Sequence, residues 1–166
     1  LISMSFSTLG LPQSLLYTLE KENYKKPYPI QKQAVPVILK GQDVLGIAQT
    51  GSGKTASYVL PVLSSLNYKK GPKDRQVDVL VLVPTRELAE QISKVLEPLA
   101  KQIKLSVLAI YGGTSYGKQR QRLGKGVDIV VATPGRLIDL MENGTIHLDD
   151  VNAVVLDEAD RMADMG

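Results

Sequence analysis

The sequence predicts an α/β domain built around a parallel sheet. Five short apolar runs, rich in Val, Ile and Leu, do not alternate with polar residues: 44–48, 77–83, 105–110, 128–132 and 153–156. Such runs are typical of parallel strands covered on both faces. Segments with the apolar spacing of amphipathic helices lie between most of them. Strands that alternate with helices favour this fold class.

Five helices are predicted from spacing and from the residues that begin them, over 14–21, 30–39, 54–66, 86–101 and 136–141. The first places Leu15, Leu16 and Leu19 on one face. Pro29 precedes the second, and proline suits the first turn of a helix. The third follows a glycine-rich loop, and the fourth carries an apolar stripe along its whole length.

Composition narrows the class of protein. A length of 166 residues indicates one domain, and the net charge of +3 permits an anionic partner. Cysteine is absent, which excludes disulfides, thiolate metal sites and a cysteine nucleophile and fits a cytoplasmic protein. No apolar run reaches transmembrane length and no signal peptide is recognisable, so we expect no membrane association.

A glycine-rich loop joins the first predicted strand to a helix. It reads Ala48, Gln49, Thr50, Gly51, Ser52, Gly53, Lys54 and Thr55. Glycines let backbone N–H groups turn around an anion, and the helix N-terminus adds partial positive charge. Lys54 then reaches the β- and γ-phosphates of a nucleotide, and Thr55 ligates Mg²⁺. A glycine turn with a chance Lys-Thr is the alternative, but the strand before and the helix after favour the phosphate loop.

The last predicted strand ends in adjacent carboxylates. Asp157 is placed to hold Mg²⁺, and Glu158 to orient or deprotonate an attacking water. Asp160 is expected to bridge to other loops. A polar loop, or an acid-rich helix start, is the alternative. Read with the phosphate loop, the carboxylates predict a nucleotide hydrolase.

Nearly the whole chain, from Phe6 to Gly166, resembles a DEAD-box RNA helicase. Six segments follow the order of the family: a Q motif at about 6–33, motif I at 48–55, motif Ia at 84–91, a glycine pair at 112–113, motif Ib at 133–136 and the DEAD sequence at 157–160. The resemblance implies a RecA-like P-loop NTPase domain over 1–166, with helices on both faces of the sheet. It departs from the family at Asn23-Tyr24, usually Gly-Phe, and at Tyr28, usually Thr.

The resemblance also implies residue roles in binding ATP and Mg²⁺. Gln31 pairs with the N6/N7 edge of adenine, because its amide both donates and accepts, and this favours ATP over GTP. Phe6 stacks on the base, although burial as an anchor of the N-terminal arm is an equal alternative. Lys54, Asp157 and Glu158 are the expected catalytic residues.

RNA is the implied partner. The resemblance implies that the protein binds the sugar-phosphate backbone of one RNA strand and does not read the base sequence. The expected contacts are Pro84, Thr85, Arg86, Gly112, Gly113, Thr133, Pro134, Gly135 and Arg136. The threonines can also serve as helix caps. Tyr111, Tyr116 and the basic run 118–122 are read as a solvated helix in preference to a stacking surface.

The chain stops soon after the DEAD sequence, so the family's Ser-Ala-Thr motif and second RecA-like domain are absent from it. We therefore expect this piece, a monomer, to bind nucleotide weakly and to hydrolyse almost none, and the complete protein to clamp RNA and unwind short duplexes. An ATP-dependent RNA clamp without unwinding is one alternative. A DNA-directed translocase is another, disfavoured by the Q motif and by residues 133–136.

Overall fold

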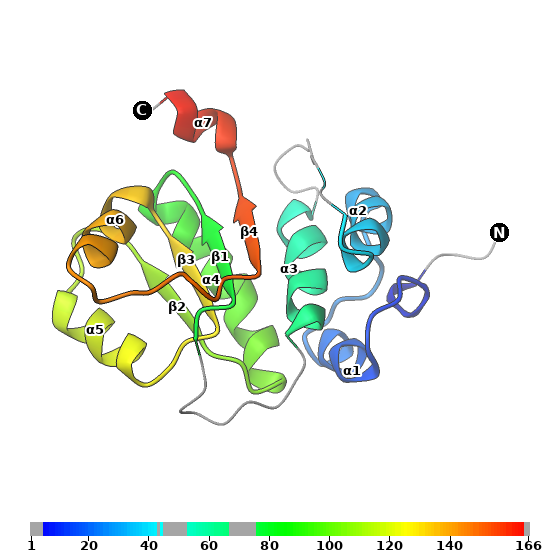
Figure 1. Cartoon of the computed structure of the whole chain (residues 1–166). Helices are drawn as coiled ribbons and strands as arrows, with labels where there is room; N and C mark the ends of the chain where they lie inside the picture. Colours follow the sequence, from blue (N-terminus) through cyan, green and yellow to red (C-terminus); the bar gives the residue numbers. More distant parts are fainter. Residues whose placement is uncertain (1–4, 43, 45–52, 67–75, 165–166) are drawn as a thin grey trace. The chain divides into compact units, whose positions relative to one another are not determined.

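The computed structural model describes residues 5–42, 44, 53–66 and 76–164, arranged in two compact parts (Figure 1). The first part comprises Leu1–Asn67 with Pro98–Ile103, and the second comprises Tyr68–Glu97 with Lys104–Gly166.

The first part is helical where it is described. After a short 3-10 turn, η1 (Phe6–Thr8), come α1 (Gln13–Lys21), α2 (Pro29–Leu39) and α3 (Lys54–Ser65). Helices α2 and α3 pack closely against each other. Leu15 and Leu19 of α1 are fully buried, as the spacing of leucines predicts. The three predicted helices are confirmed to within one residue at each end. The predicted strand 44–48 lies outside the described residues, except Val44.

The second part holds the sheet. Its strands are β1 (Val79–Leu82), β2 (Val107–Ile110), β3 (Ile129–Ala132) and β4 (Ala153–Leu156). All pair in parallel, in the order β2-β3-β1-β4. Leu80 lies opposite both Val130 and Val154. The prediction of a parallel α/β fold is therefore confirmed.

Helices cover both faces of this sheet. Leu137 and Leu140 of α6 (Pro134–Glu142) pack against the face that carries Leu80 and Val130, with Leu123 of α5 (Tyr116–Gly124) beside them. Helix α4 (Arg86–Gln102) joins β1 to β2, a crossover that runs along the sheet in the opposite direction from those of α5 and α6. Because such crossovers are right-handed, α4 covers the other face (Figure 1).

Strand β4 departs from the prediction that every strand is buried on both faces. Val154 and Leu156 are 56% and 57% exposed. Register places them on the face of Leu80 and Leu82, the face that α5 and α6 cover over the other strands. Within the described residues, β4 is the end strand and these two helices do not extend over it.

A short helix that the sequence pattern does not predict, α7 (Ala159–Asp164), follows β4. Its six residues carry too few apolar positions to form a periodic stripe. Over the residues described, no helix combines the length and the apolar character needed to span a membrane.

Candidate nucleotide and RNA site

The predicted RNA-binding segments and the DEAD carboxylates follow the strands of the second part. They lie at 84–86 after β1, 112–113 after β2, 133–136 after β3 and 157–158 after β4. Since the strands are parallel, all four segments leave the carboxyl edge of one sheet. Ligands of open α/β sheets bind outside this edge.

In the first part, the predicted adenine reader contacts the end of the predicted phosphate loop. Gln31 is only 2% exposed, and its Nε2 donates to the carbonyl oxygen of Gly53 at 3.0 Å. Its Oε1 accepts from the backbone N–H of Tyr28 at 3.0 Å. A side-chain amide has four hydrogen-bonding positions, so these two bonds leave one donor and one acceptor position on Gln31.

Gly53 has a φ of +81° and forms the N-cap of α3. A Cβ built at this position would lie 2.5 Å from Nε2 of Gln31 and 2.6 Å from the ring of Tyr28. Two features favour glycine at this position: the left-handed backbone conformation, and the close approach of the Gln31 and Tyr28 side chains. Tyr28, where the family usually has threonine, supplies part of this packing.

Lys54 and Thr55 open α3 and are half-buried. The first turn of a helix has N–H groups without intrahelical acceptors and carries partial positive charge. The two residues thus begin a helix end suited to an anion. The predicted loop residues Ala48, Gln49, Thr50, Gly51 and Ser52 lie outside the described residues.

Phe6 is buried, with 5% of its surface exposed. It packs edge-on against Tyr24, at 6.3 Å between ring centroids and 76° between planes. Both rings line a cavity of about 550 Å³, together with Leu16, Leu19 and Glu20 among others. Gln31 is not among the described residues that line it. The anchoring role of Phe6 is thus present, and its stacking on adenine stays a prediction.

Asn23 explains one departure from the family pattern. Its φ is +63°, in the left-handed region. The family usually has glycine here, and asparagine is among the few other residues that adopt this conformation readily. The turn that leads to Tyr24 is therefore kept.

The DEAD carboxylates differ from each other in environment. Asp157 is 5% exposed, and its backbone N–H donates to Leu82 across the sheet at 3.0 Å. Glu158 is half-buried and has a φ of +53°, which is unusual for a residue with a side chain. Its Oε2 lies 3.5 Å from Nη1 of Arg161. Strained backbone of this kind is concentrated at functional sites, which supports the role predicted for Glu158.

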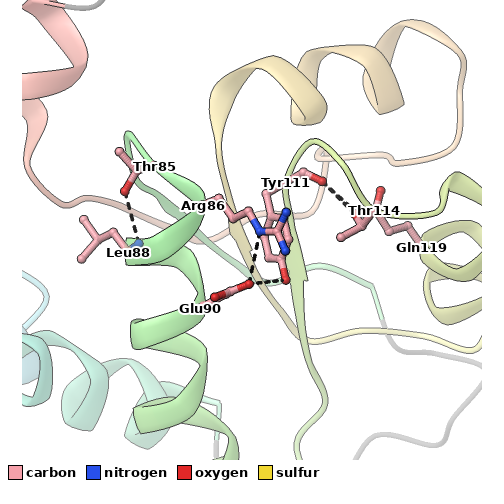
Figure 2. A network of polar contacts seen from close by, with 7 residues as sticks. All are labelled: Thr85, Arg86, Leu88, Glu90, Tyr111, Thr114 and Gln119. Atoms are coloured by element: carbon pink, nitrogen blue, oxygen red, sulfur yellow. Dashed lines mark hydrogen bonds and ion pairs between the residues drawn. The ribbon is translucent and has the colours of Figure 1, made fainter.

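Arg86 lies in a closed network with Glu90 and Tyr111 (Figure 2). Its Nε is 3.3 Å from Oε1 of Glu90, which also accepts from the hydroxyl of Tyr111 at 3.0 Å. The guanidinium lies over the Tyr111 ring, 5.0 Å from its centroid. Its Nη1 would lie 3.3 Å from a Cβ at Gly113, so motif Ia and the glycine pair meet here.

These contacts shift two pKa values in opposite directions. The hydrogen bonds from Tyr111 and then Arg86 hold the pKa of the Glu90 carboxyl below its usual range. Desolvation, followed by the hydrogen bond to Glu90, raises the pKa of Tyr111. The network therefore stabilises an ionised Glu90 and a neutral Tyr111.

Arg136 has a different setting. One nitrogen, Nη1, donates to the carbonyl oxygen of Thr114 at 3.0 Å and to Oε1 of Gln119 at 3.1 Å. The guanidinium also stacks on Tyr116, 3.9 Å from the ring centroid. The hydroxyl of Tyr116 donates to Asp139 at 3.0 Å, and this bond raises the pKa of Tyr116.

The two threonines predicted as caps also differ. The Oγ1 of Thr85 accepts from the N–H of Leu88 at 3.2 Å and caps α4. Thr133 stands at the N-cap of α6, but its side chain makes no capping hydrogen bond. Of the other residues in these segments, Pro84 is buried, Pro134 is half-buried, and Gly112 and Gly135 are exposed.

Four residues in the polar networks around the predicted RNA-binding segments were not singled out from the sequence: Glu90, Thr114, Gln119 and Asp139. Glu90 stands four residues after Arg86, a spacing at which opposite charges meet on a helix, so this pair had a readable pattern. Gln119 and Asp139 had none, because their partners lie on other elements.

The sequence profile of the family described as DEAD/DEAH box helicase matches residues 28–166. The ATP-dependent RNA helicase DeaD of Buchnera aphidicola subsp. Acyrthosiphon pisum is 47% identical over 99% of this chain and 27% of its own length. DEAD-box ATP-dependent RNA helicase 20 of Arabidopsis thaliana is 47% identical over 98% of the chain and 32% of its own length. The ATP-dependent RNA helicase DeaD of Escherichia coli K12 is 45% identical over 98% of this chain and 25% of its own length.

The parallel sheet, covered by helices on both faces and carrying its motif residues at the carboxyl edge, is an α/β domain of the RecA-like class. The chain belongs to the DEAD/DEAH box helicase family. It spans about a quarter to a third of the length of the relatives named above.

Proposed function

We propose that this chain is the first RecA-like domain of an ATP-dependent RNA helicase. The observation that carries the proposal is the meeting of three motif segments at one edge of the sheet. Arg86 lies over Gly113, and Arg136 binds the carbonyl oxygen of Thr114. Strand β4 brings Asp157 to the same edge. Predicted RNA contacts thus lie on the same sheet edge as Asp157, a carboxylate predicted to act at the nucleotide. This arrangement favours a site in which RNA binding and nucleotide hydrolysis are coupled.

ATP is bound mainly by residues of the first part. Lys54 and the N-terminal N–H groups of α3 hold the β- and γ-phosphates. The two unused hydrogen-bonding positions of Gln31 pair with the N6/N7 edge of adenine. Guanine has an acceptor where adenine has its amino group, so ATP is preferred over GTP.

Thr55 and Asp157 are the proposed ligands of Mg²⁺, and each would hold the ion through an oxygen, from a hydroxyl in Thr55 and a carboxylate in Asp157. Hydroxyl and carboxylate oxygens are the donors that this hard cation prefers, so the residues present fit it. When bound, the ion neutralises charge that develops on the phosphate oxygens.

Glu158 acts as the general base in ATP hydrolysis. The carboxylate takes a proton from a water whose oxygen forms a bond to the γ-phosphorus. The bond from that phosphorus to the β–γ bridging oxygen breaks, and ADP leaves with the electron pair. The arginine finger, worth about 10³–10⁵ in rate in related NTPases, belongs to a second RecA-like domain of the intact protein. The 166-residue chain alone is therefore expected to bind nucleotide weakly and to turn over little.

RNA is held through its backbone, because the predicted contacts are mainly two arginines, hydroxyls and glycine backbone. Such contacts position the strand and read no sequence. We expect the intact protein to be cytoplasmic, in keeping with the absence of cysteine from these 166 residues.

The test is a set of three assays on the intact protein: RNA-stimulated ATP hydrolysis, unwinding of a short RNA duplex, and retention of single-stranded RNA. ATP-dependent unwinding supports a helicase. Retention without unwinding replaces the helicase with an ATP-dependent clamp. Equal competition by single-stranded DNA overturns the RNA assignment, and absence of nucleotide hydrolysis overturns the enzyme assignment.

A further inference from the structure

The turn after β2 is held by a polar cluster of three residues: Thr114, Gln119 and Arg136. Gln119 is only 4% exposed. Its Nε2 donates to the Oγ1 of Thr114 at 2.6 Å and, at 3.5 Å, to the carbonyl oxygen of Tyr111. Thr114 Oγ1 in turn donates to the same carbonyl oxygen at 2.8 Å (Figure 2). Both ends of the glycine pair at 112–113 are therefore fixed by Gln119.

Arg136 completes this cluster from α6. Both hydrogens of its Nη1 are used, one by the carbonyl oxygen of Thr114 and one by Oε1 of Gln119. The guanidinium plane is fixed in addition by the ring of Tyr116, which Asp139 holds through the hydroxyl. Arg136 thus fixes the turn through its hydrogen bonds to Thr114 and Gln119.

Arg86 has the opposite character. Its side chain is 53% exposed, its Nε is held by Glu90, and its guanidinium lies 5.0 Å from the centroid of the Tyr111 ring. Its Nη1 lies next to Gly113, at the backbone that is expected to approach RNA. An arginine anchored at Nε keeps its two terminal amino groups for a phosphate.

We propose that the two arginines divide the work of the RNA site: Arg86 binds a phosphate, whereas Arg136 and Gln119 are positioning residues that hold the glycine pair at 112–113 in the RNA-binding conformation. This inference rests on the proposed RNA-backbone site. A lysine at position 136 keeps the positive charge. It cannot reproduce the two hydrogen bonds from Nη1 together with the contact of a planar guanidinium with the Tyr116 ring. The two arginines should therefore respond differently to a change that keeps the charge.

The experiment compares Arg86→Lys, Arg136→Lys and Gln119→Met in the intact protein, with Arg120→Lys as the matched control. Arg120 is exposed on α5. Methionine keeps the length of glutamine without its polar atoms. We expect Arg136→Lys and Gln119→Met each to weaken single-stranded RNA binding about tenfold, the effect of one or two lost hydrogen bonds. The Arg120→Lys control should stay within about threefold of the unaltered protein, and Arg86→Lys, which keeps the charge near the phosphate but loses Nε and one amino group, should weaken RNA binding less than Arg136→Lys does.

Salt dependence separates contact from positioning. Arg86→Ala should lower the slope of log affinity against log salt by about 0.7, the value for one phosphate on a single strand. Arg136→Lys should leave this slope unchanged. Kinetically, the positioning variants should raise the RNA concentration for half-maximal ATP hydrolysis, with kcat at saturating RNA and nucleotide affinity retained. A variant that merely unfolds loses all three together.

A double-mutant cycle completes the test. Adding Gln119→Met to Arg136→Lys should weaken RNA binding by less than about a further twofold, because both substitutions break the same cluster. Adding Gln119→Met to Arg86→Ala should instead multiply the two losses of RNA affinity. If Arg136→Lys binds RNA like the control, the positioning role is overturned. If Arg86→Ala and Arg136→Ala both leave RNA binding unchanged, the RNA site itself is wrong.

Discussion

The side-chain amide of Gln31 donates to the carbonyl oxygen of Gly53 at 3.0 Å, across 22 residues of sequence. One end of this contact belongs to the segment expected to read adenine, and the other ends the loop expected to hold phosphates. Because Gln31 is buried, the bond ties the two segments together before a nucleotide arrives. A nucleotide can therefore act on both segments through one amide.

Replacing Gln31 should affect both nucleotide choice and stability. Gln31→Ala is expected to narrow the preference for ATP over GTP, measured by calorimetry. It should also lower the free energy of unfolding by about 1–3 kcal/mol, because the groups bound by the amide lose a partner. Gln33→Ala, an exposed glutamine on the same helix, is the control. An unchanged ATP-to-GTP ratio would contradict the reading of adenine by Gln31.

Gly53 allows strain and crowding to be separated. Gly53→Ala adds a methyl group at a φ of +81°, within 2.6 Å of two side chains. Gly41→Ala adds one at a φ of +78°, with nothing within 4 Å. In urea unfolding, we expect Gly41→Ala to cost about 1 kcal/mol for the backbone and Gly53→Ala to cost more, about 2–4 kcal/mol. Equal losses would mean that the Gln31 and Tyr28 side chains simply move aside.

Lys54 should be required for nucleotide binding and not for folding. Lys54→Ala removes the point charge expected on the β- and γ-phosphates. ATP binding in calorimetry should be abolished, with the circular dichroism spectrum and the unfolding midpoint retained. Lys40→Ala, on an exposed residue at the end of α2, is the control for loss of one charge. Unchanged ATP affinity in Lys54→Ala would refute the phosphate site.

Glu158 should separate hydrolysis from binding. Glu158→Gln is expected to slow single-turnover ATP hydrolysis by the intact protein by about 10²–10⁴ while ATP affinity is kept, because the amide cannot accept the proton. The matched variant Arg161→Gln removes the ion-pair partner and leaves the carboxylate. Its rate should stay close to that of the unaltered protein. A comparable loss in both variants would point to the ion pair instead of the base.

The Glu90–Tyr111 hydrogen bond predicts a pH response. The pKa of Glu90 is lowered in the folded chain, so its contribution to stability is present above the ordinary pKa and is lost as pH falls through the lowered value. The pKa of Tyr111 is raised, so its contribution is present below the ordinary pKa and is lost as pH rises through the raised value. Glu90→Gln should move the phenolate titration of Tyr111 to lower pH, measured by ultraviolet difference against Tyr111→Phe. A Tyr111 titration that does not move would contradict the contact.

Fold and site were predictable to different extents. Runs such as that containing Val79 and Val81 are dense enough in branched residues to mark buried strands, and parallel pairing brings their carboxyl ends together without further information. The exposure of Val154 was not predictable, because it depends on how far neighbouring helices extend. The role of Gln119 was hidden for a similar reason: its partner Arg136 comes from another helix, and no periodicity encodes such a contact.

The position of β1 within the sheet has a consequence for synthesis. Val79 pairs with Ile129 on one side and with Ala153 on the other. A ribosome therefore releases this interior strand long before either of its neighbours exists. Until residue 132 has emerged, both edges of β1 are open hydrogen-bonding templates in a strongly apolar segment, and the edge that pairs with β4 stays open until residue 156 has emerged. Closure of the sheet waits for contacts distant in sequence, which slows folding and leaves the nascent chain open to aggregation.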